Sequence, residues 1–223
     1  MMDYTFKRVT LLAGHYGSGK TNITVHLALR LRQERDRVAV ADLDIVNPYF
    51  RTKDSQYDLE QAGIRFICSE YANSNLDIPA LPQTLYAITD DRDLSCILDI
   101  GGDDRGALAL GRLAPDILAE NNFDMLFVVN FYRPLTTTVD DALEVMREIE
   151  TAGGIPFTGI VHNSNLGDET TAQTLLSAVP RANALSEKSG LPIVATAVRR
   201  ALENELREKI SPLWGLDLQA KIR

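Results

Sequence analysis

The sequence has few cysteines, and this scarcity excludes a disulfide-stabilised secreted domain. Only Cys68 and Cys96 are present, and they lie far apart, so they form neither a C-x-x-C pair nor a disulfide framework. The N-terminus also lacks the charged, then apolar, then small-residue order of a secretory signal. We therefore expect two small thiols buried in a core and a reducing, cytoplasmic location.

Long apolar runs and excess positive charge are also absent. No segment approaches the roughly 20 apolar residues of a membrane span. The chain has 23 Lys and Arg against 31 Asp and Glu, a net charge of −8 at pH 7, whereas a broad nucleic-acid-binding face needs clustered basic residues. Ser211-Pro212 and Gly215 interrupt the C-terminal segment, which disfavours a basic membrane-surface helix. We expect neither nucleic acid nor membrane as a partner.

The composition that remains is that of a globular protein. The 223 residues are 45% hydrophobic and 24% charged, which is ordinary for a folded domain. The sequence contains no fixed-period repeat and no low-complexity linker. We therefore expect a single domain spanning residues 1–223.

Short apolar runs alternate with segments of helical periodicity. The runs lie at residues 9–13, 38–41, 64–68, 94–100, 125–130, 159–162 and 192–195. The helical segments lie at about 23–31, 50–62, 108–120, 138–152, 169–178, 183–189 and 199–210, and residues 69–82 read as a loop. This alternation predicts an α/β fold with a doubly wound, mostly parallel sheet and helices on both faces. Ligands bind such sheets at the carboxyl ends of the strands.

The loop after the first predicted strand carries a complete phosphate-binding motif. It reads Gly14-His15-Tyr16-Gly17-Ser18-Gly19-Lys20-Thr21, which is G-x-x-x-x-G-K-S/T, the P-loop. Glycines let successive backbone N–H groups turn toward phosphate oxygens, and the following helix N-terminus adds partial positive charge. We expect Lys20 to reach the β- and γ-phosphates and the Thr21 hydroxyl to bind Mg²⁺. Gly14, Gly17, Ser18 and Gly19 complete the predicted nucleotide site.

Three carboxylates follow the next strands in the predicted sheet. Asp42 and Asp44 come at the end of the second strand, and Asp99 ends the strand before Gly101-Gly102. At a strand end, one of the first two could hold Mg²⁺ through water while the other orients the attacking water. Asp99 fits the second acidic position of P-loop proteins, which supports the metal. We therefore expect Thr21, Asp42 and Asp99 at the metal.

The order of these motifs resembles the MinD/ParA/CobQ-type ATPases. The P-loop, then Asp42-x-Asp44, then Asp99-x-x-Gly102 carry the resemblance. It implies Mg·ATP bound at the edge of a mostly parallel sheet, and often a dimer that encloses the nucleotide and opens on hydrolysis. It implies that Asp44 orients the catalytic water, that Asp42 lies near the metal, and that residues 131–134 lie near the nucleotide.

One departure from the resemblance concerns the second P-loop position. The family has a lysine there that reaches the partner's phosphates, but this chain has His15, whose side chain is shorter and is near neutral at pH 7 in its reference state. Either His15 substitutes in part, or Arg51 or Arg105 does, or hydrolysis is slow.

The segment after the sixth predicted strand indicates which nucleotide base the site prefers. It reads His162-Asn163-Ser164-Asn165-Leu166 and lacks the N-K-x-D pattern that GTPases of this class use for guanine. Guanine is disfavoured, and an adenine contact by Asn163 fits the sequence.

The function that these residues favour is a Mg-dependent, ATP-binding switch with slow ATP hydrolysis, acting as a homodimer or on a protein partner. Three alternatives stay open. A small-molecule kinase would need an acceptor pocket, for which residues 69–82 are a candidate. A metal-insertion GTPase would need Cys or His ligands, yet the histidines are scattered. A non-hydrolysing nucleotide-binding regulator would need only the P-loop.

Overall fold

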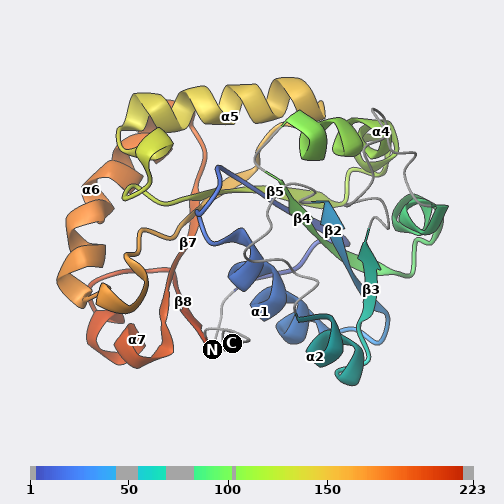
Figure 1. Cartoon of the computed structure of the whole chain (residues 1–223), viewed down its shortest axis with the longest axis horizontal. Helices are drawn as coiled ribbons and strands as arrows, with labels where there is room; N and C mark the ends of the chain where they lie inside the picture. Colours follow the sequence, from blue (N-terminus) through green and yellow to red (C-terminus); the bar gives the residue numbers. More distant parts are fainter. Residues whose placement is uncertain (1–3, 44–54, 69–82, 102–103, 218–223) are drawn as a thin grey trace.

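The computed structural model describes residues 4–43, 55–68, 83–101 and 104–217, and its centre is one parallel sheet (Figure 1). The eight strands have the order β3-β2-β4-β1-β5-β6-β7-β8, and all neighbours run parallel. Their bounds are β1 Val9–Ala13, β2 Val38–Leu43, β3 Arg65–Cys68, β4 Ser95–Ile100, β5 Phe123–Val129, β6 Gly159–His162, β7 Ile193–Arg199 and β8 Leu213–Leu216. Because every strand is parallel, all the carboxyl ends lie at one edge of the sheet.

Helices cover both faces of this sheet. Their bounds are α1 Lys20–Arg32, α2 Gln56–Gln61, α3 Ala87–Asp90, α4 Asp104–Glu120, α5 Val139–Gly153, α6 Ala172–Ser189 and α7 Arg200–Leu206, with 3-10 turns η2 Gln83–Tyr86, η3 Pro134–Thr136 and η4 Gly167–Glu169. Helices α4 and α5 lie along one face, and α1 and α2 along the other (Figure 1). A hydrophobic core lies on each face of the sheet. Successive side chains of β1 point to opposite faces, so Leu11 lies in one core and Leu12 in the other. The predicted doubly wound α/β fold is confirmed.

Three elements differ from what the sequence pattern predicts. The two helical segments that the pattern ends and restarts around Pro180 form the single helix α6, which contains Pro180. Its buried stripe, with Ala178, Ala182 and Leu185, runs past the proline, so packing maintains one helix. The short helix α3 and the edge strand β8 are not predicted. Strand β8 has only four residues, including Gly215, and its Trp214 packs edge-on against Tyr4, with ring centroids 5.3 Å apart.

One of the two thiols lies in the middle of the sheet. Cys96 is on β4, which pairs with both β2 and β1, and it is fully buried. Burial raises the pKa of Cys96 to about 12, because a thiolate there would lose its hydration. The expectation of a buried thiol is confirmed for Cys96, whereas the side chain of Cys68 lies outside the described part of the structure. No helix among the described residues is long and apolar enough to span a bilayer.

A buried histidine ends strand β6. His162 is fully inaccessible to solvent, and its Nδ1 lies 3.3 Å from the Thr196 hydroxyl on β7. Loss of hydration, with a smaller effect of the nearby Arg181 charge, lowers the pKa of His162 to about 4. The folded protein therefore keeps this imidazole neutral over a pH range in which an exposed histidine would take up a proton.

This burial predicts a loss of stability in mild acid. The unfolded chain protonates His162 near pH 6.5 and the folded chain only near pH 4. The free energy of unfolding therefore keeps the full contribution of the neutral imidazole above pH 6.5. As the pH falls toward 4, it decreases by about 3 kcal/mol in total. Urea unfolding of the wild type and of His162→Gln at pH 7 and at pH 5 measures this effect. The variant should lose less stability over this interval, and an identical loss in both proteins would contradict the assignment.

Candidate nucleotide-binding site

The P-loop connects β1 to α1 at the carboxyl edge of the sheet, as the motif predicts. Two of its glycines have no room for a side chain. A Cβ on Gly14 would lie 2.3 Å from the Val128 carbonyl oxygen, and a Cβ on Gly19 would lie 2.2 Å from the Asn163 amide nitrogen. Gly19 also has φ +92°, in the left-handed region that other residues rarely adopt. The loop is therefore packed tightly against the end of β5 and against Asn163, which follows β6.

Lys20, the first residue of α1, folds back over this loop. Its Nζ donates hydrogen bonds to the carbonyl oxygens of Gly14, at 2.9 Å, and His15, at 3.4 Å. The side chain is 4% exposed, so the ammonium is enclosed by the loop and not spread on the surface. A lysine held in this position lies beside backbone N–H groups of a helix N-terminus, which is the arrangement that binds phosphate.

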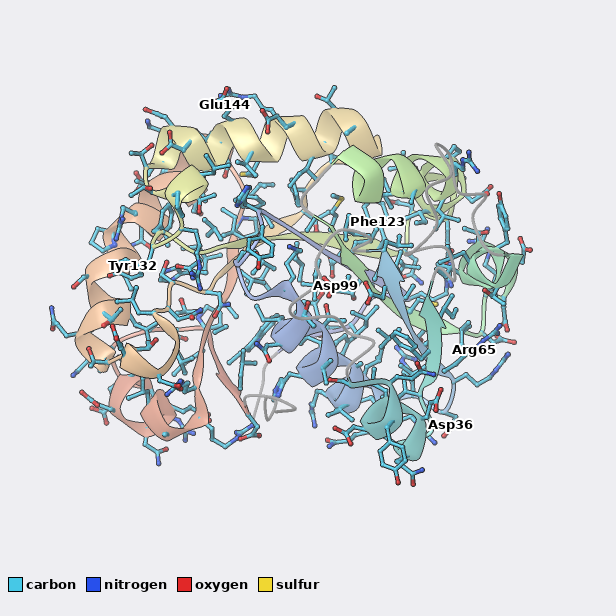
Figure 2. All side chains as sticks on the ribbon, viewed as in Figure 1. Asp36, Arg65, Asp99, Phe123, Tyr132 and Glu144 are labelled. Carbon is cyan, nitrogen blue, oxygen red and sulfur yellow. The ribbon has the colours of Figure 1, made fainter. Side chains whose placement is uncertain are left out.

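The predicted metal residues converge beneath the loop. The Thr21 hydroxyl donates a hydrogen bond of 2.8 Å to the Asp99 carboxylate, and Asp99 lies near the start of α1 (Figure 2). Asp42 on β2 is the register partner of Asp99 on β4, and both are buried. Three oxygen-bearing residues from α1, β2 and β4 therefore occupy neighbouring positions, with Thr21 and Asp99 in direct contact. Asp44 and Gly102 lie outside the described residues.

Two side chains from other loops hold the outer side of the P-loop. The Asn163 amide nitrogen donates to the Ser18 carbonyl oxygen at 2.6 Å, and Arg133 Nε donates to the Gly17 carbonyl oxygen at 2.9 Å. The Ser18 hydroxyl is buried and has no hydrogen-bond partner in the described part of the protein. The resemblance placed residues 131–134 near the nucleotide, but no motif singled out Arg133, because its contact with Gly17 is created by folding alone.

The loops after β5 and β6 are tied together by amide side chains. Asn130 accepts hydrogen bonds from the backbone of Tyr132, at 3.0 Å, and of Asn165, at 3.3 Å, and donates to the Asn165 carbonyl oxygen at 3.1 Å. The Asn165 side chain in turn donates to the Asn163 carbonyl oxygen at 2.9 Å. These hydrogen bonds therefore hold the backbone of Asn163 in the position from which its side chain contacts the P-loop.

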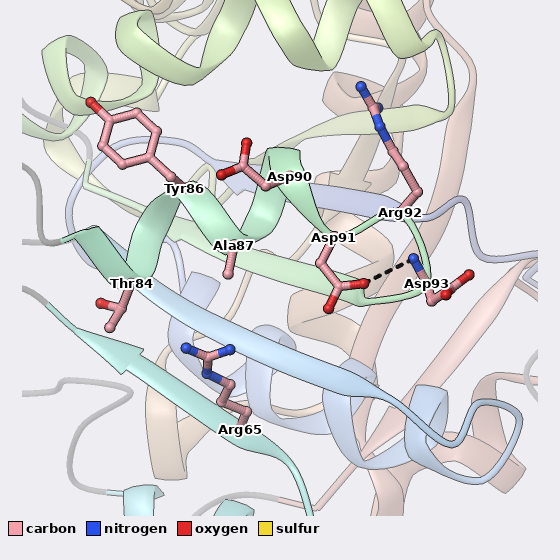
Figure 3. A pocket seen from close by; sticks show the side chains of 8 residues that line it. All are labelled: Arg65, Thr84, Tyr86, Ala87, Asp90, Asp91, Arg92 and Asp93. Carbon is pink, nitrogen blue, oxygen red and sulfur yellow. Dashed lines mark hydrogen bonds between the residues drawn. The ribbon is translucent and has the colours of Figure 1, made fainter.

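A separate pocket of about 820 Å³ lies at the other end of the sheet (Figure 3). It is lined by Arg65 and by residues between 84 and 93, which precede or begin strands β3 and β4. A strand rises about 3.3 Å per residue, so the six residues of β4 place this pocket roughly 20 Å from the carboxyl edge. The pocket is therefore distinct from the P-loop.

Among the described residues, no three His, Cys, Asp or Glu side chains form a group that could hold a metal ion.

Comparisons with solved structures identify the fold. FtsY from the chloroplast of Physcomitrella patens is 18% identical with a TM-score of 0.54, and the match covers 86% of this chain and 59% of that one. FtsY from Thermotoga maritima is 19% identical with a TM-score of 0.53, over 85% and 60% of the two chains. The chain thus spans about three fifths of these FtsY structures.

A third structure is similar to the same degree. The signal recognition particle 54 kDa protein from Aeropyrum pernix, solved with GDP, is 16% identical with a TM-score of 0.51, and the match covers 87% of this chain and 42% of that one. At these identities the likeness establishes a shared P-loop fold. The comparison with curated proteins gives no match.

The sequence itself gives the family. Residues 9–189 match the CobQ/CobB/MinD/ParA nucleotide-binding domain, a stretch that includes the P-loop, Asp42, Asp99 and Asn163. This agrees with the P-loop geometry and with the resemblance carried by the sequence motifs. The chain belongs to the CobQ/CobB/MinD/ParA family of nucleotide-binding domains.

Proposed function

We propose that this chain is a Mg-dependent, ATP-binding protein that hydrolyses ATP slowly and uses its nucleotide state to switch its interaction with a protein partner in the cytoplasm. The observation that carries the proposal is the hydrogen bond between Thr21 and Asp99. It joins a P-loop hydroxyl to a carboxylate at the end of a neighbouring strand, which are the two kinds of side chain that hold Mg²⁺ in P-loop proteins.

The residues present fit a magnesium nucleotide. Thr21, Asp42 and Asp99 offer hard oxygen donors, which suit Mg²⁺, and the buried Ser18 hydroxyl has no hydrogen-bond partner among the described residues. A phosphate oxygen at the loop would satisfy that hydroxyl. Bound there, Mg²⁺ would supply positive charge to the phosphate oxygens. Its proposed ligands are the Thr21 hydroxyl and, directly or through water, Asp42 and Asp99.

Lys20 and Asp44 are the proposed catalytic residues. Lys20 would exchange the Gly14 carbonyl oxygen, 2.9 Å from its Nζ, for the β- and γ-phosphates, where a cation stabilises the charge of the transition state. Asp44, which lies outside the described residues, would orient the attacking water. The backbone N–H groups of the loop, from Gly14 to Gly19, would cradle the remaining phosphate oxygens.

Asn163 supports the choice of adenine. Its amide nitrogen is engaged with the Ser18 carbonyl oxygen at 2.6 Å, so the amide oxygen, an acceptor, is the atom proposed to receive the exocyclic amino group of adenine. Guanine is the competing base, since one structure with the same fold, the signal recognition particle protein from Aeropyrum pernix, was solved with GDP.

A protein partner, including a second copy of the chain, is supported by the surface around the P-loop. Tyr16, Leu135 and Leu166 are 53%, 56% and 45% exposed. They lie on the loops after β1, β5 and β6, which are adjacent strands. Exposed apolar residues gathered at one edge are typical of interaction sites, and a partner bound there would contact the loops that surround the nucleotide.

The kinase alternative stays open, because its candidate acceptor segment, residues 69–82, lies outside the described residues. The pocket at Arg65 and residues 84–93 lies at the amino edge of the sheet, roughly 20 Å from the phosphate loop by strand length. An acceptor bound in that pocket would therefore be out of reach of the γ-phosphate. The metal-insertion GTPase is tested by base preference, and the non-hydrolysing regulator is tested by turnover.

Nucleotide binding should depend on Lys20. Lys20→Ala should weaken Mg·ATP binding by about 10- to 100-fold, because hydrogen bonds to charged groups contribute roughly 1.5–3 kcal/mol. Lys209→Ala, which removes an exposed lysine just after α7, is the matched control and should bind like the wild type. Isothermal titration calorimetry with and without EDTA measures both effects. A wild type that binds no ATP in the presence of Mg²⁺ would refute the proposed function.

Base preference should favour adenine. With a fluorescent ATP analogue bound, unlabelled ATP should displace the probe at a concentration at least about tenfold lower than GTP, a difference of about 1.4 kcal/mol. Asn163→Ala should reduce this ratio, because the acceptor proposed for the adenine amino group is removed. Tighter binding of GTP would instead support the GTPase alternative.

Turnover should depend on Asp44. Asp44→Ala should retain ATP binding and lose about 100-fold or more of the single-turnover hydrolysis rate, since a positioned acid–base group contributes roughly that much. Asp36→Ala, which changes an exposed aspartate at the periphery of the molecule (Figure 2), is the control. An unchanged rate in Asp44→Ala would remove this residue from the mechanism, and no hydrolysis by the wild type would favour the non-hydrolysing regulator.

A further inference from the structure

The pocket at the amino edge of the sheet is formed by two separate segments. Its volume is about 820 Å³, which is within the range of roughly 300–1,000 Å³ that is typical of sites for small organic ligands. Arg65, at the start of β3, forms one side, and residues between 84 and 93, which precede β4, form the other (Figure 3). Strand β2 lies between β3 and β4. A ligand in this pocket would therefore extend across the amino end of β2.

Several charges that line this pocket are already paired with other side chains. The Asp91 carboxylate accepts a hydrogen bond of 3.2 Å from the Arg37 guanidinium, and Arg92 forms an ion pair with Glu120. Asp93 lies 3.9 Å from the same Arg37 guanidinium, and its backbone N–H donates to Asp91 at 3.2 Å (Figure 3). These residues therefore hold the segment before β4 in place, and their charges are largely compensated inside the protein.

Two charges of opposite sign on the pocket lining have no such partner. Neither Arg65 nor Asp90 forms an ion pair or a side-chain hydrogen bond with another residue in the ranges that the structure describes, and both are exposed. A guanidinium matches a carboxylate through two parallel hydrogen bonds, and a carboxylate accepts hydrogen bonds from an ammonium group. Charges in a concave site attract an oppositely charged ligand more strongly than charges on an open surface. The pocket therefore offers one anion-binding group and one cation-binding group.

The two groups lie on opposite sides of the pocket. In Figure 3, Arg65 and Thr84 are on one side of Ala87, and Tyr86 and Asp90 are on the other. Tyr86 and Asp90 are four positions apart across the turn η2 and helix α3, a spacing that places side chains on one face. An ammonium group bound to Asp90 would therefore also meet the Tyr86 ring, which is part of a residue 39% exposed and whose face attracts cations.

The spacing of the strands indicates the length of the ligand. Neighbouring strands are about 4.7–4.9 Å apart, so β3, which carries Arg65, and β4, which follows Asp90, are roughly 10 Å apart with β2 between them. An extended peptide advances about 3.3–3.6 Å per residue, so roughly three residues cover this distance. A free amino acid carries both charges on one carbon atom and is too short to contact both groups.

We infer that this pocket binds a short zwitterionic peptide of about three residues. Arg65 receives the peptide carboxylate, Asp90 receives the ammonium group beside the Tyr86 ring, and the body of the peptide lies over Ala87. The Thr84 hydroxyl, which has no hydrogen-bond partner among the described residues, is available to the peptide amides. The site is separate from the phosphate loop, so the inference goes beyond the proposed function and does not depend on it.

Three synthetic peptides test each end of the proposed site on the full wild-type chain. Gly-Leu-Gly carries both terminal charges, its N-acetyl form lacks the ammonium group, and its C-terminal amide lacks the carboxylate. Calorimetry at pH 7 and low salt measures each dissociation constant. The zwitterion should bind with a Kd below about 1 mM. The acetylated and amidated forms should each bind about tenfold more weakly or worse, because each loses one charge-assisted hydrogen bond.

Variants of the chain assign the two ends. Arg65→Gln should bind the zwitterion about tenfold more weakly and no longer distinguish it from the amide. Asp90→Asn should lose affinity to a similar extent and no longer distinguish the zwitterion from the acetylated form. Arg112→Gln and Asp116→Asn, which change exposed residues of α4 outside the pocket, are the matched controls and should bind like the wild type. All four unfolding temperatures should stay within about 2 °C of the wild type.

Other outcomes overturn the inference. It fails if the wild type binds no zwitterion at about 10 mM peptide, or if it binds the acetylated or amidated form equally well. Because these comparisons use the wild type, they hold even where a variant does not fold. Equal losses in the variants and the α4 controls would assign the effect to overall charge. A wild type that binds Mg·ATP but not the peptide would refute this inference alone, and one that binds only the peptide would refute the proposed function alone.

Discussion

A loop that binds an anion through its N–H groups must turn its carbonyl oxygens away from the anion, and those oxygens then need partners of their own. In this protein the partners are side chains. Lys20, Arg133 and Asn163 donate to the carbonyl oxygens of Gly14, Gly17 and Ser18, respectively. These three contacts fix the direction of the loop backbone. The rest of the site depends on them, because a loop that turned over would present acceptors to the phosphates.

The parallel sheet brings these partners within reach. Strands β4, β1, β5 and β6 are consecutive neighbours, and their carboxyl ends face the same edge. The loop after β1 is therefore flanked by the loops after β5 and β6 on one side and by Asp99, at the end of β4, on the other. Helix α6 adds a second layer, since Arg181 fixes the loop that holds Arg133. The contact of Arg133 with the phosphate loop thus depends on the packing of α6, which does not itself touch that loop through Arg181.

The sequence predicts those parts of the site that are encoded locally. The glycine spacing and Lys20-Thr21 define the P-loop, and acidic residues directly after apolar runs lead to Asp42 and Asp99, which the structure places as register partners. The contact of Arg133 with Gly17 could not be predicted in this way, because the two residues lie 116 positions apart in the sequence. Strand β8 was missed for a similar reason, since four residues form a strand there only because β7 lies beside them. The role of Asp44 rests on resemblance alone.

The buried thiol on β4 can report when the central strand becomes exposed to solvent. Cys96 lies three residues before Asp99, on the strand between β2 and β1. With its pKa raised to about 12, it holds almost no thiolate at neutral pH, and alkylating reagents act on the thiolate. In a chain with Cys68 replaced by serine, and with enough reagent that labelling is faster than reclosing, the rate of labelling would equal the rate at which this part of the sheet separates. The effect of a bound nucleotide on that rate would measure how firmly the ligand clamps the two neighbouring strands together.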